Sequence, residues 1–76
     1  MKLINVDSSM IHAVGYDART RTMEVVFNSG RTYCYGEVPQ KVYKGLLAAG
    51  SKGRYMLDAV IDVFPYHQAR GRRRQA

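Results

Sequence analysis

The chain contains a single cysteine, Cys34, no tryptophan and only two prolines among its 76 residues. One cysteine excludes an internal disulfide bond. With the two histidines, His12 and His67, it also provides too few ligands, at no suitable spacing, for a structural zinc site. We therefore expect no metal and no other cofactor. This cysteine usage fits a reducing compartment best.

Long apolar runs are also missing. No stretch approaches the roughly 18 to 20 residues that a membrane-spanning helix needs, and the N-terminal residues 1–7 become polar too early for a signal peptide. We expect a soluble, cytoplasmic protein without a membrane partner. A chain of 76 residues forms one small domain that buries about 60% of its unfolded surface, so a deep catalytic pocket is not expected.

Acidic residues are scarce: six of them face twelve lysines and arginines, which gives a net charge of +6. Four of these positive charges are Arg70, Arg72, Arg73 and Arg74, so residues 1–69 carry a net charge of only +2. The basic character is thus concentrated at the C-terminus. A basic tail next to a nearly neutral domain often indicates an anionic partner, although charge runs also occur simply as solvated segments.

The first half of the chain has the pattern of a small sheet. Asn28-Ser29-Gly30 lies between two runs of β-forming residues and predicts a tight hairpin turn, because its residues tolerate positive φ. Alternating apolar residues predict a strand over 22–28, and residues 31–35 form its partner. An earlier strand is predicted over 10–16, with Met10, His12, Val14 and Tyr16 on one face, after a short extended lead-in.

After Pro39 the apolar residues change to the i, i+4 spacing of helices. They predict one short helix that ends at Gly50, where a left-handed C-cap is expected. Ser51 is suited to be the N-cap of a second helix, from about Gly53 to Phe64, which Pro65 ends.

The sequence therefore predicts an α+β fold, in which a three-stranded antiparallel meander is followed by two short helices packed on one face. We assign residues 1–66 to this single domain. Residues 67–76 have no apolar periodicity and contain the arginine run, so we expect them to form a basic, disordered tail.

Several short motifs occur in a distinctive order. They are Ser9-Met10-Ile11, Val14-Gly15-Tyr16-Asp17, Phe27 with Gly30, Tyr33-Cys34-Tyr35, Val38-Pro39, Val42-Tyr43, Ala49, Ser51-Lys52-Gly53 and Tyr55. This succession resembles the KTSC domain over residues 7–66. That family occurs at the C-terminus of some lysyl-tRNA synthetases and as free-standing small bacterial proteins. The resemblance implies a family of unknown function, for which RNA binding is suggested by the attachment to a tRNA synthetase.

The second predicted helix departs from the family pattern. Relatives have Tyr-Phe-Asn followed by Ile-Arg, whereas this chain has Tyr55-Met56-Leu57 and then Val60-Ile61. Leu57 and Ile61 widen the apolar stripe beyond what one buried face requires. This edge favours a contact with a protein.

A nucleic-acid contact is the first functional hypothesis. Tyr33 and Tyr35 share one strand face, unstacked bases pack on exposed aromatic rings, and Arg and Lys neutralise phosphates. The candidate residues are Arg31, Tyr33, Tyr35, Lys41, Lys44, Lys52, Arg54, Arg70, Arg72, Arg73 and Arg74. The alternative interpretation places at least one of the two tyrosines in the core.

The second hypothesis is a protein-interaction module, either a homodimer or an adaptor or inhibitor of a larger enzyme, that uses Leu57 and Ile61. Catalysis is not expected, because the chain has no recognised catalytic motif and neither His12 nor Cys34 has an obvious partner in sequence. Both hypotheses describe a small, non-enzymatic binding module, which binds RNA or another nucleic acid in the first and a protein in the second.

Overall fold

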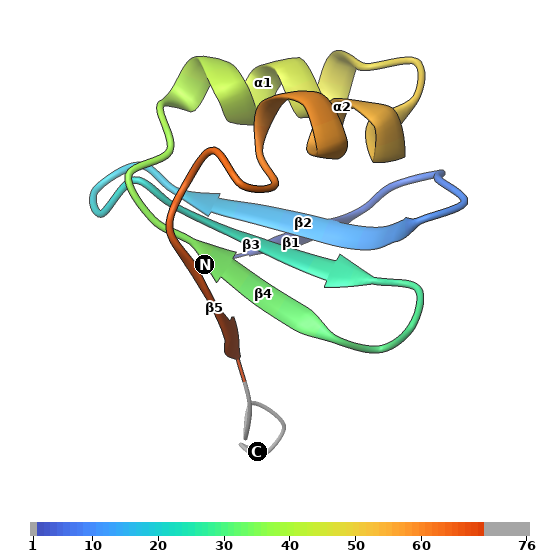
Figure 1. Ribbon diagram of the computed structural model, residues 1–76, viewed down its shortest axis with the longest axis horizontal. Coiled ribbons are helices and arrows are strands. Elements are labelled where there is room, and N and C mark those ends of the chain that lie inside the picture. Colours follow the sequence, from blue (N-terminus) through green and yellow to red (C-terminus); the bar gives the residue numbers. More distant parts are fainter. Residues whose placement is uncertain (1, 70–76) are drawn as a thin grey trace.

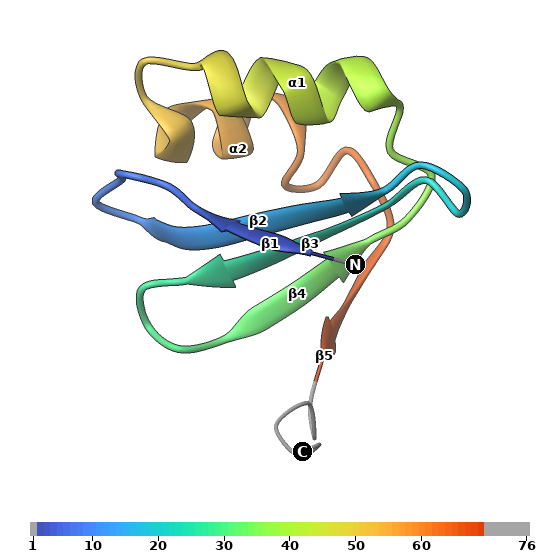
Figure 2. The ribbon, with the colours of Figure 1, turned by 180° about the vertical axis from the view of Figure 1, so that it is seen from behind.

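The computed structural model describes residues 2–69, which form a five-stranded sheet and two helices. In chain order the elements are β1 (Leu3–Asn5), β2 (Ile11–Asp17), β3 (Thr22–Phe27), β4 (Thr32–Tyr35), α1 (Gln40–Ala48), α2 (Lys52–Ala59) and β5 (Tyr66–Ala69). Both helices lie over the same face of the sheet (Figures 1 and 2). The predicted α+β fold, with helices on one face, is confirmed.

The strand order is β1-β2-β3-β4-β5, and every neighbouring pair is antiparallel. The predicted number of three strands is wrong, because β1 and β5 add one strand to each edge of the meander. Residues 67–69, which the sequence assigned to the tail, belong to β5. Strands of three or four residues are too short to show a clear alternation of apolar and polar residues in the sequence. They are recognised as strands by their pairing with the neighbouring strand. The remaining tail residues, 70–76, lie outside the described part of the chain.

The turn between β3 and β4 follows the prediction. Gly30 has a φ of 97°, and its N–H donates to the carbonyl of Phe27 at 2.9 Å. The N–H of Phe27 in turn donates to the carbonyl of Arg31 at 2.9 Å. Positive φ suits glycine, so the turn places Phe27 and Arg31 next to each other at one end of the sheet.

Strand β2 contains an irregularity that the sequence pattern did not show. Its pairing with β3 shifts between Ile11 and Ala13, as in a β-bulge. Ile11 and Val14 both join the core under the helices, while His12 is exposed. The prediction that His12 and Val14 share one face is therefore wrong, because the bulge interrupts the alternation.

Helix α1 begins after Pro39, which is its N-cap residue, and the N–H of Ala49 donates to the Leu46 carbonyl at its end. Ala49 is extended, and Gly30 is the glycine with positive φ among residues 2–69. The predicted left-handed C-cap at Gly50 is therefore wrong. The chain leaves α1 in an extended conformation and enters α2 directly.

The N-cap of α2 is Ser51 as predicted, since its hydroxyl accepts the Arg54 N–H at 3.3 Å. The helix ends at Ala59, however, not near Phe64. Asp62 has a φ of 67°, which reverses the chain after α2. Val60 is nevertheless buried, and Phe64 packs against the core, so the apolar row of the sequence continues through a turn.

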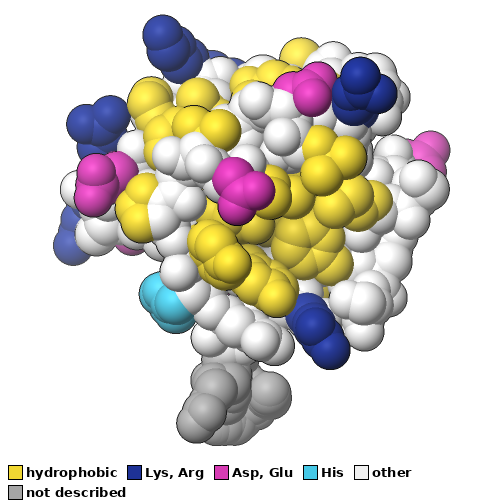
Figure 3. All heavy atoms as spheres, viewed as in Figure 1, with side chains coloured by type: hydrophobic (Ala, Val, Ile, Leu, Met, Phe, Trp, Pro, Cys, Tyr) yellow, Lys and Arg dark blue, Asp and Glu magenta, His cyan; other side chains and the backbone are white. Residues whose placement is uncertain are grey.

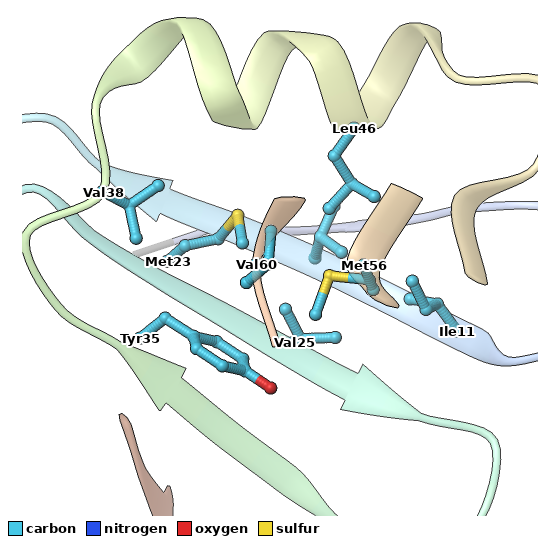
Figure 4. Packing of buried hydrophobic residues seen from close by; sticks show 9 residues of the cluster. Ile11, Met23, Val25, Tyr35, Val38, Leu46, Met56 and Val60 are labelled. Atoms are coloured by element: carbon cyan, nitrogen blue, oxygen red, sulfur yellow. The ribbon is translucent and has the colours of Figure 1, made fainter. Parts of the chain in front are cut away.

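The core lies between the sheet and the helices. Figure 4 shows Met23 and Val25 of β3 facing Leu46 of α1 and Met56 of α2. The buried cluster consists of Ile11, Val14, Met23, Val25, Tyr35, Val38, Leu46, Met56 and Val60. Each large apolar side chain removed from water stabilises the fold by about 1.5 to 3 kcal/mol.

The two helices approach closely at Gly45 of α1. The ring of Tyr55 from α2 lies against Gly45, and its hydroxyl donates to the Val42 carbonyl at 3.1 Å. This contact ties α2 to α1. In the part of the chain from residue 2 to 69, neither helix has the length and apolar character needed to cross a membrane.

Candidate nucleic-acid interface

A groove of about 510 Å³ opens on the helix side of the sheet, where β4 and β5 meet the turn after α2. It is lined by Ser9, Met10, Phe27, Asn28, Ser29, Arg31, Tyr33, Tyr35, Ile61 and Tyr66. Figure 3 shows a continuous hydrophobic surface between the helices and this edge of the sheet, with a basic side chain beside it. The lining of this groove thus combines aromatic rings with one cation, Arg31.

The sheet register brings the aromatic residues together. Tyr35 pairs with Tyr66 across β4 and β5, so their side chains share one face. The ring centroids of Tyr33 and Tyr66 are 5.4 Å apart, and those of Tyr35 and Tyr66 are 5.6 Å apart. Phe27 meets Tyr33 edge to face at 5.7 Å. The four rings form one connected aromatic cluster along the floor of the groove.

The rings differ in exposure. Tyr35 is 3% exposed and belongs to the core, whereas Tyr66 is 55% exposed and Tyr33 is half-buried. The expectation that at least one tyrosine of the Tyr-x-Tyr pair is core therefore holds for Tyr35. Tyr66, Tyr33 and Phe27 thus retain exposed surface in the groove, and Tyr66 is the most exposed of the four rings.

The environment of Tyr35 supports its structural role. Burial, with smaller contributions from the neighbouring Tyr66 and Tyr33, raises the pKa of Tyr35 to about 12. Its hydroxyl thus stays neutral at physiological pH. Tyr35 supports the other two rings from below and does not offer a stacking surface of its own.

Arg31 is the candidate cation that lines the groove among residues 2–69, and it is exposed. Lys41 and Lys44 are exposed on α1 and are not part of the lining. Arg70 and Arg72 to Arg74 lie outside the described residues. The structure thus brings Arg31 together with the aromatic rings and leaves the two lysines of α1 apart from them.

Lys52 and Arg54 lie at the start of α2. Lys52 lines a small polar pocket that shares Ser9 with the groove, and its Nζ donates to the Ala49 carbonyl at 3.0 Å. Arg54 is exposed and forms an ion pair with Asp58 at 3.3 Å. Exposed pairs of this kind contribute at most about 1 kcal/mol, so Arg54 can exchange its partner easily.

The two residues of the predicted protein interface differ in exposure. Leu57 is 59% exposed on α2, while Ile61 is half-buried and lines the groove. Ile61 therefore belongs to the same concave surface as the tyrosines. Leu57 is exposed on the outside of the helix.

Sequence reasoning missed Phe27, Met10 and Tyr66 as members of this site. Tyr66 was placed at the domain boundary, because the residues around it show no alternation. The signal in the sequence that could have indicated a strand at Tyr66 is Pro65 directly before it, since proline is tolerated at the beginning of an edge strand. Within residues 2–69, no cluster of three or more His, Cys, Asp or Glu side chains is arranged to hold a metal ion.

Comparison with known proteins gives a consistent result. The family model of the KTSC domain matches residues 7–64. A crystal structure of a KTSC domain protein from Yersinia pestis is similar to this structure with a TM-score of 0.89 and 30% sequence identity, over 91% of this chain and 97% of that chain.

The sequence relatives are of two kinds, proteins that match over most of their own length and lysine–tRNA ligases that match over a small part of theirs. A protein of Tsukamurella paurometabola is 47% identical over 51 residues, which are 67% of this chain and 76% of the relative. An uncharacterized protein of Stutzerimonas stutzeri is 42% identical over 72% of this chain and 78% of its own length. A lysine–tRNA ligase of Nostoc sp. is 36% identical over 87% of this chain, which corresponds to only 12% of the ligase.

Proposed function

This chain belongs to the KTSC domain family, and from that premise we propose that it is a small, non-enzymatic module that binds single-stranded nucleic acid, RNA in particular. The observation that carries the proposal is the groove in which the exposed ring of Tyr66 and the half-buried ring of Tyr33 lie beside Arg31. The occurrence of a similar segment in a tRNA ligase of Nostoc sp. favours RNA as the nucleic acid.

The proposed contact uses the physical properties of each lining residue. An unpaired base stacks on the exposed face of Tyr66 and reaches the half-buried ring of Tyr33, with about 1 to 3 kcal/mol for each stacked base. Arg31 at the margin of the groove neutralises an adjacent phosphate. A base in a continuous duplex has no free face to offer, so single strands are preferred over duplexes.

The arginine-rich segment adds a second, less selective contribution. Arg70 and Arg72 to Arg74 release counterions when they approach phosphates, so their part of the affinity falls steeply as salt increases. Stacking in the groove depends much less on salt. The two contributions can therefore be separated by a salt titration.

A second candidate function is a protein contact through α2 and the turn that follows it. Leu57 is 59% exposed and Val63 is 57% exposed, and Ile61 connects this region to the groove. Two exposed aliphatic side chains near an apolar groove suit a hydrophobic partner segment or a second copy of the chain. Leu57→Ser should weaken such an association and leave nucleic-acid binding unchanged.

The test is fluorescence anisotropy with a labelled single-stranded RNA and a labelled duplex DNA over a range of salt concentrations. Tyr66→Ala should weaken RNA binding by about 5-fold to 150-fold, as expected for one lost stack, and Tyr66→Trp should retain it. Arg31→Ala should weaken binding more than its matched control Lys44→Ala, which removes an exposed cation outside the groove.

The opposite outcome is equally clear. If Tyr66→Ala binds RNA like the unmodified chain, and all binding disappears in Arg72→Ala/Arg73→Ala/Arg74→Ala, only the arginine segment attracts nucleic acid. The groove then has no role in RNA binding, and the protein-contact function becomes the better explanation of its apolar lining.

A further inference from the structure

The aromatic groove also has polar lining residues, which come from two adjoining segments. They are Ser9, Asn28, Ser29 and Arg31. Ser9 lies between β1 and β2, and the other three lie between β3 and β4. The two segments meet directly, because the backbone N–H of Asn28 donates to the Met10 carbonyl at 2.9 Å. One groove thus combines aromatic rings with polar groups, the combination by which proteins stack a base and hydrogen-bond its edge.

A second hydrogen bond orients the side chain of Asn28. Its Nδ2 donates to the Ser8 carbonyl at 3.1 Å. A carbonyl oxygen only accepts hydrogen bonds, so the nitrogen of the amide must face Ser8. Ser8 is not part of the groove lining, whereas Asn28 is. Within residues 2–69, the Oδ1 of Asn28 accepts no hydrogen bond, so this oxygen is an oriented acceptor that a ligand can use.

We propose that Asn28 determines the base specificity of the groove, and that it selects adenine through the exocyclic amino group of that base. This inference rests on the proposed function, since it requires a base stacked in the groove. The amino group donates to Oδ1, and the second N–H of Nδ2 is available for the adjacent ring nitrogen, as in the common pairing of asparagine with adenine. In uracil a carbonyl oxygen takes the place of the amino group, and this oxygen cannot donate to Oδ1.

The other polar residues of the lining do not provide this selectivity. Arg31 has only donors, so it suits a phosphate and offers nothing to an amino group. The hydroxyls of Ser9 and Ser29 rotate and can either donate or accept, so they match any base edge. The Ser29 hydroxyl also accepts the backbone N–H of Arg31 at 3.5 Å. Asn28 is therefore the lining residue whose fixed acceptor favours one class of base.

The test compares two labelled single-stranded oligomers of equal length by fluorescence anisotropy on the full chain. One consists of adenosine and the other of purine riboside, which lacks only the amino group. Both bases have a purine ring to stack, so the ratio of the two affinities isolates the amino group. The unmodified chain should bind the adenosine oligomer about 2-fold to 13-fold more tightly, as expected for one hydrogen bond.

Three variants assign the preference to a side chain. Asn28→Ala should abolish it and leave the affinity for the purine riboside oligomer unchanged; the φ of Asn28 is not positive, so alanine fits the backbone. Asn28→Asp keeps an acceptor oxygen and should keep the preference, although its negative charge weakens the binding of both oligomers. Ser29→Ala is the matched control, because Ser29 is the exposed neighbour that lines the same groove, and it should also keep the preference.

The outcomes separate this inference from the proposed function. If the unmodified chain binds both oligomers equally, or if Asn28→Ala retains the preference, the role of Asn28 is overturned. The proposed function still stands in that case when Tyr66→Ala weakens the binding of both oligomers. If Tyr66→Ala binds both like the unmodified chain, the proposed function fails and the base specificity fails with it. The comparison on the unmodified chain needs no substitution, so it tests the inference even if a variant disturbs the turn.

Discussion

Replacing Gly45 by alanine is a direct test of how the two helices pack. A Cβ at this position would overlap the hydroxyl of Tyr55 and lie 2.9 Å from its Cζ and 3.2 Å from its Cε1. Contacts this short force the Tyr55 ring to move. Its hydrogen bond to the Val42 carbonyl, 3.1 Å long, would then be lost.

The expected magnitude combines three effects. Alanine in place of glycine inside a helix stabilises by about 1 kcal/mol. The overpacked contact costs about 1 to 3 kcal/mol, and the lost hydrogen bond costs about 1 kcal/mol more. Gly45→Ala should therefore lower the free energy of unfolding by about 1 to 3 kcal/mol, although helix propensity alone predicts a gain.

Urea unfolding followed by circular dichroism measures this change. Tyr55→Phe removes the closest atom, so Gly45→Ala/Tyr55→Phe should be more stable than the sum of the two single effects predicts. Gly50→Ala is the control, because a Cβ there would meet nothing within 4 Å. If Gly45→Ala stabilises the protein as helix propensity alone would, the close contact between Gly45 and Tyr55 is refuted.

Three further predictions concern the core, the N-cap of α2 and the ionisation of Tyr35. Met56→Ala should lower the free energy of unfolding by about 2 to 5 kcal/mol in urea titrations, because Met56 is fully buried; a smaller loss would contradict its place in the core. Ser51→Ala should cost about 0.5 to 2 kcal/mol by removing the α2 cap, and Ser51→Asp should restore it. Burial, assisted by neighbouring acidic groups, raises the pKa of Tyr35 from 10.0 to about 12. The folded state then holds this proton more tightly than the unfolded chain, so the contribution of Tyr35 to stability is complete below pH 10 and is lost as the pH rises from 10 to 12. Unfolding titrations across that range should show the loss in the unmodified chain and a weaker pH dependence in Tyr35→Phe.

Features that depend on neighbouring residues could be predicted from the sequence. The turn at Gly30 requires positive φ, and the cap at Ser51 requires a side-chain oxygen before the helix. Both are local properties of a few residues. The alternation of β3 is equally local, because successive side chains of a strand point to opposite faces.

Features that depend on distant pairing could not be predicted. β5 is recognised as a strand only through its hydrogen bonds to β4, and the bulge in β2 is defined only against β3. Gly50 is suited to a left-handed C-cap, but its φ is not positive in the structure. Such features are set by tertiary contacts, which override local preference.

The candidate site also contains residues that the sequence identified and residues that only the fold brings together. Arg31 and Tyr33 were identified because they are close in sequence to the predicted turn and strand. Tyr66 reaches Tyr33 only after the chain has passed through both helices and returned to the sheet. The sequence therefore identified Tyr33 and Tyr35 of the aromatic cluster, whereas Tyr66 joins it only through the return of the chain.

Leu3 of β1 and Ala69 of β5, near the two ends of the described residues, line one pocket on the sheet face that the helices leave uncovered, whereas the aromatic groove opens on the helical side. A connection to a neighbouring domain can thus be made at either end without obstructing the groove. The fold is suited to work alone or as an appendage of a larger protein, with the same surface available in both settings.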